Sequence, residues 1–301
     1  MVKLSQDRLE IYQELAAEIG NTPLVEYQGS LPNNNRILIK RECDNPFGSH
    51  YDRVYLSLFQ EWEKRGMHPP KNVLESSSGS AGVSFSGIGK RLEYSCYVMI
   101  PEGEQLQKRR EAILAESAQL ILTPADEYIN GFPKRIRYYR DQLDAVFLNH
   151  SMGIHGSNNE TTLHALEDIA TEVLSETDID IFVAGLGNGS SLVGPGRIFK
   201  KFNPDLYVVG YKPLQSGRND LPGLLNQDSL QPDMIIPFPH LKEAKKLMNK
   251  EMTVPDTLSK EVGHEDLGKT SRAGLLVALE LAQDVRDKIF LVIGYDKVDR
   301  Y

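Results

Sequence analysis

The fold is decided by residues 180–191, DIFVAGLGNGSS, in which a strand, a glycine-rich loop and the start of a helix follow one another. The apolar run Ile179–Ala184 does not alternate with polar residues, which is typical of a parallel strand that is covered on both faces. The loop Gly185–Ser191 follows, and a helical pattern extends over Leu192–Lys201. A strand that leads into a helix through a short loop is the repeating unit of a parallel sheet.

The same alternation of short apolar runs and helical patterns extends in both directions from this stretch. Further strands are predicted at Leu24–Tyr27, Arg36–Lys40, Asn72–Glu75, Tyr94–Ile100, Leu120–Leu122, Ala145–Leu148, Leu206–Tyr211 and Ile289–Ile293. Helices are predicted at 7–18, Asp52–Lys64, Val83–Arg91, Leu106–Glu116, Phe132–Gln142, Glu160–Leu174, Leu241–Lys250 and Ala273–Val285. The pattern predicts an α/β protein with mostly parallel sheets, whose domain boundaries lie in ordinary loops near Lys40 and His150.

Composition excludes several classes of function. The 301 residues include 34 Lys and Arg against 42 Asp and Glu, and a chain of net charge −8 without basic clusters is a poor ligand for nucleic acid. Cys43 and Cys96 form neither a disulfide framework nor a metal-ligand spacing, and we predict no metal site. Because no apolar run reaches the ~20 residues that span a bilayer and the N-terminus has no signal-peptide pattern, we expect a cytoplasmic protein that does not enter membranes.

Two loops carry the composition of an anion site. Ser76–Gly82 and Gly185–Ser191 each follow a predicted strand and precede a predicted helix. Glycines let backbone N–H groups approach an anion, and the helix contributes the positive end of its dipole. The alternative is a tight turn that needs glycine only for its backbone dihedral angles.

Read in order, five segments resemble the cysteine synthase and cystathionine β-synthase family of pyridoxal-phosphate-dependent enzymes. They are Ile19–Val25 (IGNTPLV), Asn45–Arg53 (NPFGSHYDR), Ser77–Gly82 (SSGSAG), Val183–Ser191 (VAGLGNGSS) and Asp296–Tyr301 (DKVDRY). The resemblance implies fold type II, as in the tryptophan synthase β subunit, with two three-layer α/β/α domains. It places residues 1–40 and 151–301 in a larger domain and 41–150 in a smaller, mobile one, and it implies a homodimer.

The resemblance also implies a role for each loop. Relatives grip the substrate carboxylate with the loop that corresponds to Ser77, Ser78, Gly79, Ser80 and Ala81. They hold the cofactor phosphate with the loop that corresponds to Gly185, Gly187, Asn188, Gly189, Ser190 and Ser191. The serine that meets the cofactor's ring nitrogen corresponds to Thr270 or Ser271.

Four positions depart from the family pattern. The lysine that forms an imine with pyridoxal phosphate is replaced by Tyr51, and a phenol cannot form an imine. Ser80 replaces an asparagine that contacts the cofactor ring, and Arg272 replaces a glycine beside the ring nitrogen. Lys212 replaces a glutamate that helps some relatives to bind a cation. Its ammonium either substitutes for that cation or is solvated at a strand end, and a relocated imine lysine is a further hypothesis.

The pair His50 and Tyr51 is the candidate catalytic group of the altered site. A phenol beside a base can act as a general acid or base, whereas the alternative is that Tyr51 fills the space of the missing lysine and ring. Three functions remain open. The chain binds a small anionic ligand, either an amino acid or a phosphorylated compound, without the usual chemistry; or it is a pyridoxal-phosphate lyase or transferase that holds its cofactor non-covalently; or it is a partner-binding regulatory subunit.

Overall fold

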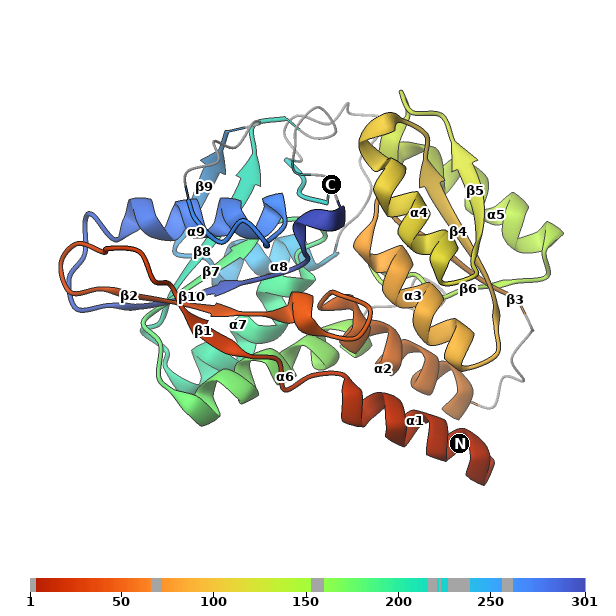
Figure 1. Cartoon of the computed structure of the whole chain (residues 1–301), viewed down its shortest axis with the longest axis horizontal. Coiled ribbons are helices and arrows are strands. Elements are labelled where there is room, and N and C mark those ends of the chain that lie inside the picture. Colours follow the sequence, from red (N-terminus) through yellow and green to blue (C-terminus); the bar gives the residue numbers. More distant parts are fainter. Residues whose placement is uncertain are drawn as a thin grey trace. The chain divides into compact units, whose positions relative to one another are not determined.

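The computed structural model describes residues 4–65, 72–152, 160–215, 221, 223–226, 239–255 and 262–300. The chain forms two compact units (Figure 1). Unit 1 comprises Met1–Gly20, Asn45–Thr162 and Arg300–Tyr301, and unit 2 comprises Asn21–Asp44 and Leu163–Asp299. The predicted α/β class is confirmed, because each unit is built on one sheet that is mostly or wholly parallel.

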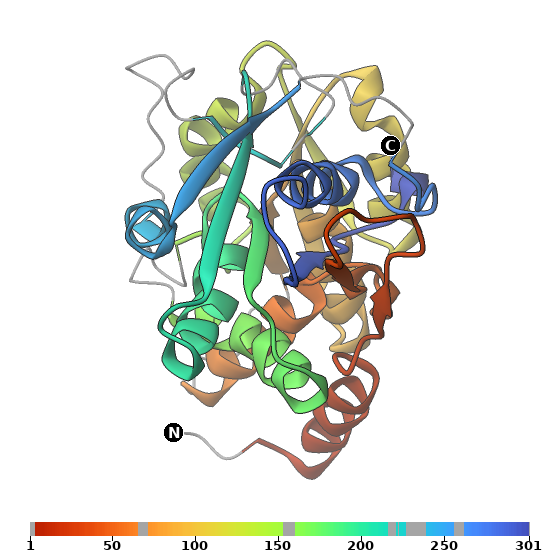
Figure 2. The same ribbon diagram turned by 90° about the vertical axis from the view of Figure 1, so that its left-hand side faces the viewer.

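Unit 2 contains a six-stranded sheet in the order β1-β2-β10-β7-β8-β9. Its strands are β1 (Leu24–Glu26), β2 (Arg36–Lys40), β7 (Ile181–Gly185), β8 (Tyr207–Pro213), β9 (Lys250–Val254) and β10 (Ile289–Ile293). All neighbours are parallel except β1 and β2. Its α-helices are α6 (Glu160–Glu176, which begins in unit 1), α7 (Ser190–Phe202), α8 (Pro239–Leu247) and α9 (Lys269–Leu281). Helix α9 covers one face of the sheet, and α6, α7 and α8 lie on the other (Figure 2). Short 3₁₀ turns occur at η1 (Glu42–Asp44) and η7 (Val298–Arg300).

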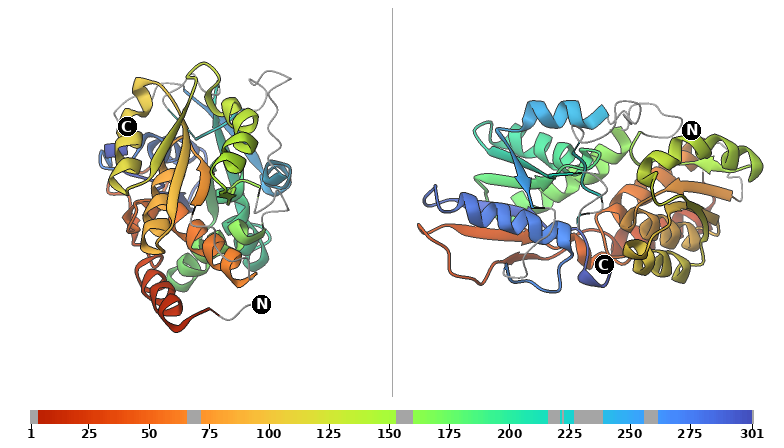
Figure 3. Two further views of the ribbon diagram at one scale, coloured as in Figure 1. Left: turned by 90° about the vertical axis from the view of Figure 1, so that its right-hand side faces the viewer. Right: turned by 90° about the horizontal axis from the view of Figure 1, so that it is seen from above.

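Unit 1 contains a four-stranded parallel sheet in the order β5-β4-β3-β6. Its strands are β3 (Asn72–Ser76), β4 (Ser95–Pro101), β5 (Gln119–Thr123) and β6 (Val146–Phe147). Its α-helices are α1 (Gln6–Glu18), α2 (Tyr51–Lys64), α3 (Ser80–Arg91), α4 (Gln107–Ala115) and α5 (Gly131–Gln142), with 3₁₀ turns η2 (Glu104–Leu106) and η3 (Tyr128–Asn130). Helix α5 lies on the opposite face of the sheet from α3 and α4 (Figure 3). The sheet is therefore the middle of three layers.

The register of unit 1 positions its candidate site. Strands β3 and β6 are parallel neighbours, with Leu74 opposite Phe147. Their carboxyl ends therefore meet at one edge of the sheet, which is where ligands bind in open parallel sheets. The loop Ser76–Gly82 leaves β3 at this edge, and His150 follows the end of β6.

The division of the chain differs from the predicted domains at its N-terminus. Residues 1–20 were expected with the larger domain, but they belong to unit 1. The physical reason is Arg8 in α1, whose guanidinium donates to the buried carboxylate of Glu63 in α2 at 2.7 and 2.9 Å and to the carbonyl of Leu92 at 2.8 Å. The remaining boundaries lie at 44/45 and 162/163 rather than near 40 and 150.

Two features of the secondary structure were predicted incorrectly. The helix expected over Leu241–Lys250 is present as α8, but strand β9 after it was not predicted, because its sequence KEMTV is largely exposed at the sheet edge. Helices α3 and α9 begin at Ser80 and Lys269, one turn before their predicted starts, so that Ser80 and Thr270 lie in first helical turns. Among the residues that the structure describes, no helix is long and apolar enough to cross a membrane.

Candidate ligand-binding site

The loop between β3 and α3 in unit 1 is closed by one serine. The Ser77 hydroxyl accepts hydrogen bonds from the N–H groups of Gly79 and Gly82, both at 2.9 Å. Gly79 has φ +158°, and a Cβ built there would lie 2.4 Å from Cδ of Arg109. Glycine is therefore required at this position both for backbone conformation and for space.

Helix α3 starts from this loop at Ser80, and the N–H of Gly82 in its first turn donates to the Ser77 hydroxyl. Gly79 is its N-cap residue, and no side-chain cap bond is formed there. The first N–H groups of a helix have no partner within the helix, and they carry the positive end of its dipole. Ser78 and Ser80 are half-buried beside this end, whereas Ala81 is buried. The predicted carboxylate loop is thus a helix N-terminus flanked by hydroxyl-bearing residues.

A buried cation holds this loop in place. Arg109 of α4 is only 2% exposed, and its guanidinium donates to the carbonyls of Ser78 at 2.9 Å and Arg300 at 3.1 Å. Both carbonyls belong to unit 1. The buried guanidinium also adds positive charge behind the loop, which favours an anion in front of it.

His50 and Tyr51 lie together at the start of α2. Their ring centroids are 4.1 Å apart, His50 is buried and Tyr51 is half-buried. Burial, assisted by the charges of His150 and Arg53, lowers the pKa of His50 to about 3. His50 is therefore a neutral imidazole near neutral pH, which excludes it as a cation for anion binding.

A hydrogen-bonded network ties the start of α2 to α3. The Ser84 hydroxyl of α3 donates to Asp52 and lies 2.9 Å from the Ser49 hydroxyl, while Asp52 also accepts the N–H of Phe47 at 2.7 Å. Ser84 is one helical turn after Ser80 and contacts its carbonyl. This network brings the Tyr51 end of α2 beside the first turn of α3.

Three further polar residues of unit 1 were not identified from the sequence. The carboxylate of Glu75 is fully buried at the end of β3, and it accepts N–H groups from Ser76 at 2.8 Å and His150 at 3.2 Å. The Tyr55 hydroxyl lies 3.0 Å from Nδ1 of His150. Two signals could have found them: Glu75 and His150 end neighbouring parallel strands, and Tyr55 is one helical turn after Tyr51.

In unit 2, the loop between β7 and α7 is closed by its own asparagine. The side-chain oxygen of Asn188 accepts the N–H of Ser190 at 2.9 Å and its hydroxyl at 2.7 Å. Such a turn satisfies the helix start internally. Gly189 has φ +92°, and a Cβ there would lie 2.9 Å from the backbone of His240.

The buried phenol of Tyr295 accepts a hydrogen bond from a further backbone N–H group of the same loop. The Tyr295 hydroxyl accepts the N–H of Gly185 at 2.9 Å and lies 3.4 Å from the Ser191 hydroxyl. Burial raises the pKa of Tyr295, so the phenol stays protonated. A Cβ at Gly187 would lie 2.4 Å from the carbonyl oxygen of Gly223, so backbone covers that side of the loop.

Two tyrosines connect this loop to Thr270 and Ser271 in the first turn of α9. The N–H of Tyr295 donates to the Ser271 hydroxyl at 2.8 Å, and the Tyr211 hydroxyl donates to the Thr270 carbonyl at 2.9 Å. The residues that the sequence assigned to phosphate and ring nitrogen are thus brought together within unit 2. Arg272 is half-buried beside them.

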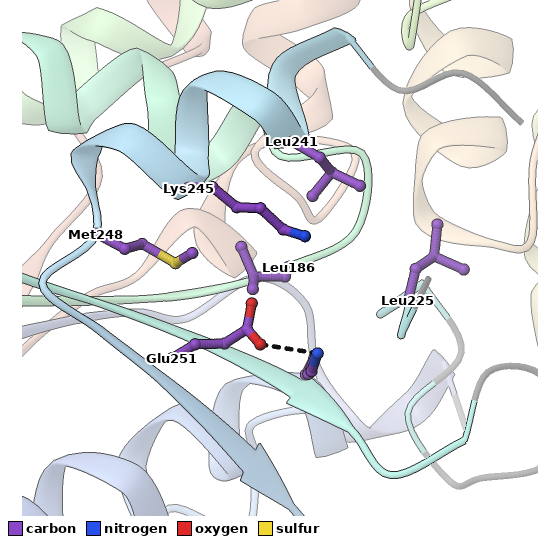
Figure 4. Close-up of a pocket in the computed structure, with 7 residues that line it drawn as sticks. Leu186, Leu225, Leu241, Lys245, Met248 and Glu251 are labelled. Atoms are coloured by element: carbon purple, nitrogen blue, oxygen red, sulfur yellow. Dashed lines mark ion pairs between the residues drawn. The ribbon is translucent and has the colours of Figure 1, made fainter. Parts of the chain in front are cut away.

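Lys212 lies in a small pocket of unit 2 and is paired. Its ammonium is 2.7 Å from the carboxylate of Glu251 in β9, a partner that the sequence did not reveal because β9 was not predicted. The pocket has a volume of about 20 Å³ and is lined by Leu186, Lys212, Leu225, Leu241, Lys245, Met248 and Glu251 (Figure 4). That volume suits a water molecule rather than a metabolite. Among the described residues, no group of three or more His, Cys, Asp or Glu side chains could hold a metal ion.

Residues 15–257 match the family model described as pyridoxal-phosphate dependent enzyme. The chain belongs to this family. The predicted membership of the cysteine synthase and cystathionine β-synthase group, with fold type II, is confirmed.

Two members of this family have sequences that are similar to this chain along nearly its whole length. Cysteine synthase B of Pseudomonas aeruginosa is 28% identical and covers 96% of both chains. Cysteine synthase B of Escherichia coli is 28% identical and covers 95% of this chain and 93% of its own.

Solved structures of the family share the fold. An O-acetylserine dependent cystathionine beta-synthase from Helicobacter pylori has a TM-score of 0.81 at 22% identity, covering 100% of this chain and 98% of its own. An O-ureido-L-serine synthase has a TM-score of 0.78 at 20% identity, covering 95% of this chain and 92% of its own. At these identities the likeness concerns the fold alone.

Proposed function

We propose that this family member binds a small carboxylate, such as an amino acid, at the N-terminus of α3 and does not carry out pyridoxal-phosphate β-replacement. The observation that carries the proposal is the buried guanidinium of Arg109, which holds the loop at the start of α3 and adds positive charge behind it. In the loop before α3 the Ser77 hydroxyl accepts the N–H groups of Gly79 and Gly82, whereas in the loop before α7 Asn188 and Tyr295 accept donors of Ser190 and Gly185.

A carboxylate suits the loop of unit 1 for three reasons. The start of α3 carries the positive end of the helix dipole, which favours negative charge by about 0.3–1 kcal/mol. Ser78 and Ser80 place hydroxyl-bearing side chains at the same end. Arg109 fixes the loop from behind through the Ser78 carbonyl, so the site is formed before a ligand arrives.

Pyridoxal phosphate cannot be held in this chain by the imine bond that the family's lysine forms. Tyr51 stands at the position of the imine lysine, and its phenol cannot form that bond. In unit 2, the N–H of Gly185 and both donors of Ser190 already have partners within the chain. A phosphate group would have to displace the Asn188 and Tyr295 oxygens to use these donors.

A charge at the start of α3 tests the proposal. Ser80→Asp places a carboxylate on the helix N-terminus, which stabilises the helix but repels a carboxylate ligand. We expect calorimetric titration with L-serine, L-cysteine or acetate to show at least ~10-fold weaker binding in Ser80→Asp than in the wild type, with an unchanged or higher Tm. Gln107→Asp is the matched control, because Gln107 is exposed at the start of α4 in the same unit.

Two outcomes would contradict this function. Wild-type protein that binds none of these carboxylates would remove the proposed ligand class. Protein that stays yellow after dialysis with pyridoxal phosphate would favour the alternative, an amino-acid lyase or transferase with a non-covalent cofactor.

A further inference from the structure

We propose that Arg272, in the first turn of α9, is an anion-binding residue of unit 2 that takes a phosphate group. This site lies outside the carboxylate site of unit 1 and does not depend on it. The inference is carried by the place of Arg272 at the sheet edge, by the missing acceptor of its guanidinium and by the charges in the same helical turn.

The start of α9 lies at the carboxyl end of a strand of the six-stranded sheet. The two residues after β10 and its glycine hold the helix there: the N–H of Tyr295 donates to the Ser271 hydroxyl, and the Asp296 carbonyl accepts the N–H of Gly268, both at 2.8 Å. Arg272 belongs to this turn, because its own N–H donates to the Gly268 carbonyl at 3.1 Å. The carboxyl edge is where open parallel sheets bind ligands.

The guanidinium of Arg272 is partly buried without an acceptor. The residue is half-buried, and its Nε atom is shielded from solvent and forms no hydrogen bond. Arg272 also forms no ion pair with an acid in the part of the chain that the structure describes. A donor removed from water without an acceptor costs free energy, and a bound anion recovers that cost.

A second donor of the same turn also has no acceptor. Ser271 is fully buried, and its hydroxyl accepts the N–H of Tyr295. A serine hydroxyl can donate one hydrogen bond while it accepts another, but no acceptor among the described residues takes the Ser271 proton. Ser271 and Arg272 therefore present two neighbouring donors for which the described chain supplies no oxygen.

The charges of this turn favour an anion. Lys269 and Arg272 are three residues apart and so lie on one side of the helix, and the first turn of α9 contains no acidic residue. Gly268, the N-cap residue, gives no side-chain cap. Cations at a helix N-terminus are opposed by the helix dipole, and a phosphate group reverses this effect. Its oxygens also match the planar donor edge of a guanidinium.

Phosphate binding to Arg272 variants tests the inference. In calorimetric titration with inorganic phosphate at constant ionic strength, we expect at least ~10-fold weaker binding in Arg272→Gln than in the wild type. Arg272→Lys keeps the charge but loses the planar fork, so its affinity should fall between the two. Arg286→Gln is the matched control, because Arg286 is an exposed cation of the same unit and should leave affinity within about 2-fold.

The melting temperature separates a binding role from a packing role. In chloride buffer we expect Arg272→Gln to have a Tm equal to or above that of the wild type, because no protein acceptor is lost. Added phosphate should then raise the Tm of the wild type and of Arg286→Gln, but not that of Arg272→Gln. A Tm that is lowered equally in chloride and in phosphate by Arg272→Gln would overturn the inference.

Further outcomes separate the two sites of the chain. Phosphate binding that Ser80→Asp abolishes and Arg272→Gln leaves unchanged would assign the phosphate to unit 1 and overturn the inference. Wild-type protein that binds L-serine but no phosphate would overturn it and leave the proposed function standing. Glycerol phosphate distinguishes the source of the group: binding that depends on Arg272 supports a phosphorylated small molecule, and binding of inorganic phosphate alone supports the free ion.

Discussion

The loops Ser76–Gly82 and Gly185–Ser191 occupy equivalent positions in the two sheets, but they are held by different side chains. Each leaves the end of a buried parallel strand, contains glycine and serine, and starts an α-helix. In unit 1 the loop is held from behind by Arg109, and the Ser77 hydroxyl accepts the N–H groups of Gly79 and Gly82. In unit 2 the side-chain oxygens of Asn188 and Tyr295 accept hydrogen bonds from the N–H groups of Ser190 and Gly185.

The difference shows that glycine content alone does not define an anion site. Glycines allow the backbone to approach a ligand, but they equally allow a phenol or an asparagine to approach the backbone. Whether donors remain for a ligand depends on tertiary contacts. Gly185 and Tyr295 are 110 residues apart in the chain, so no local pattern could reveal this bond.

The largest expected effect comes from removing the buried cation behind the first loop. Arg109→Met leaves the carbonyls of Ser78 and Arg300 without that donor, and we expect a loss of about 3 kcal/mol or more in the free energy of unfolding by urea. Lys108→Met is the control, since Lys108 is exposed and its replacement should cost less than ~0.5 kcal/mol. Equal losses in the two variants would mean that the loop is not held by Arg109.

The next effect concerns the acid stability of unit 1. His50 is neutral in the folded chain down to about pH 3, whereas in the unfolded chain its pKa is near 6.5. As pH falls from 6.5 toward 3, the unfolded state takes up a proton that the folded state does not. This uptake lowers stability by at most about 1.4 kcal/mol per pH unit.

The variant His50→Gln should lose this contribution. We expect its free energy of unfolding to fall less steeply than that of the wild type between pH 6 and 4, and to differ little in slope between pH 7 and 8. Parallel curves for the two proteins across the acid range would show that His50 is not held neutral by burial.

The smallest effect on stability comes from opening the second loop. Asn188→Ala frees the N–H and hydroxyl of Ser190, and it should cost about 1 kcal/mol, as for loss of a helix cap. The same change should create binding of inorganic phosphate that is stronger than in the wild type, measured by calorimetry. Asn203→Ala is the matched control, because Asn203 accepts the N–H of Asp205 in an exposed turn of the same type. Phosphate binding that is unaffected by Asn188→Ala would mean that its side chain does not close the loop.

The sequence predicted most of the fold, because strands such as Ile181–Gly185 are apolar and continuous and their loops are rich in glycine. It missed β9, whose residues are polar at a sheet edge, and it misplaced α1, whose attachment depends on the long-range pair of Arg8 and Glu63. The two loops and Tyr51 were also singled out in the sequence, and their role in a site stays a prediction. Tyr295 was not, because its contacts with Gly185 and Ser271 join distant segments of the chain.

We propose that each of the two loops has been altered within its own unit, so that the missing lysine is one change among several. Tyr51→Lys tests it directly. The protein is incubated with pyridoxal phosphate, treated with borohydride and examined by mass spectrometry after dialysis. We predict no cofactor fixed at position 51, because Asn188 and Tyr295 still occupy the donors of the second loop. One equivalent of cofactor fixed at that position would contradict the claim and show that only the lysine had been lost.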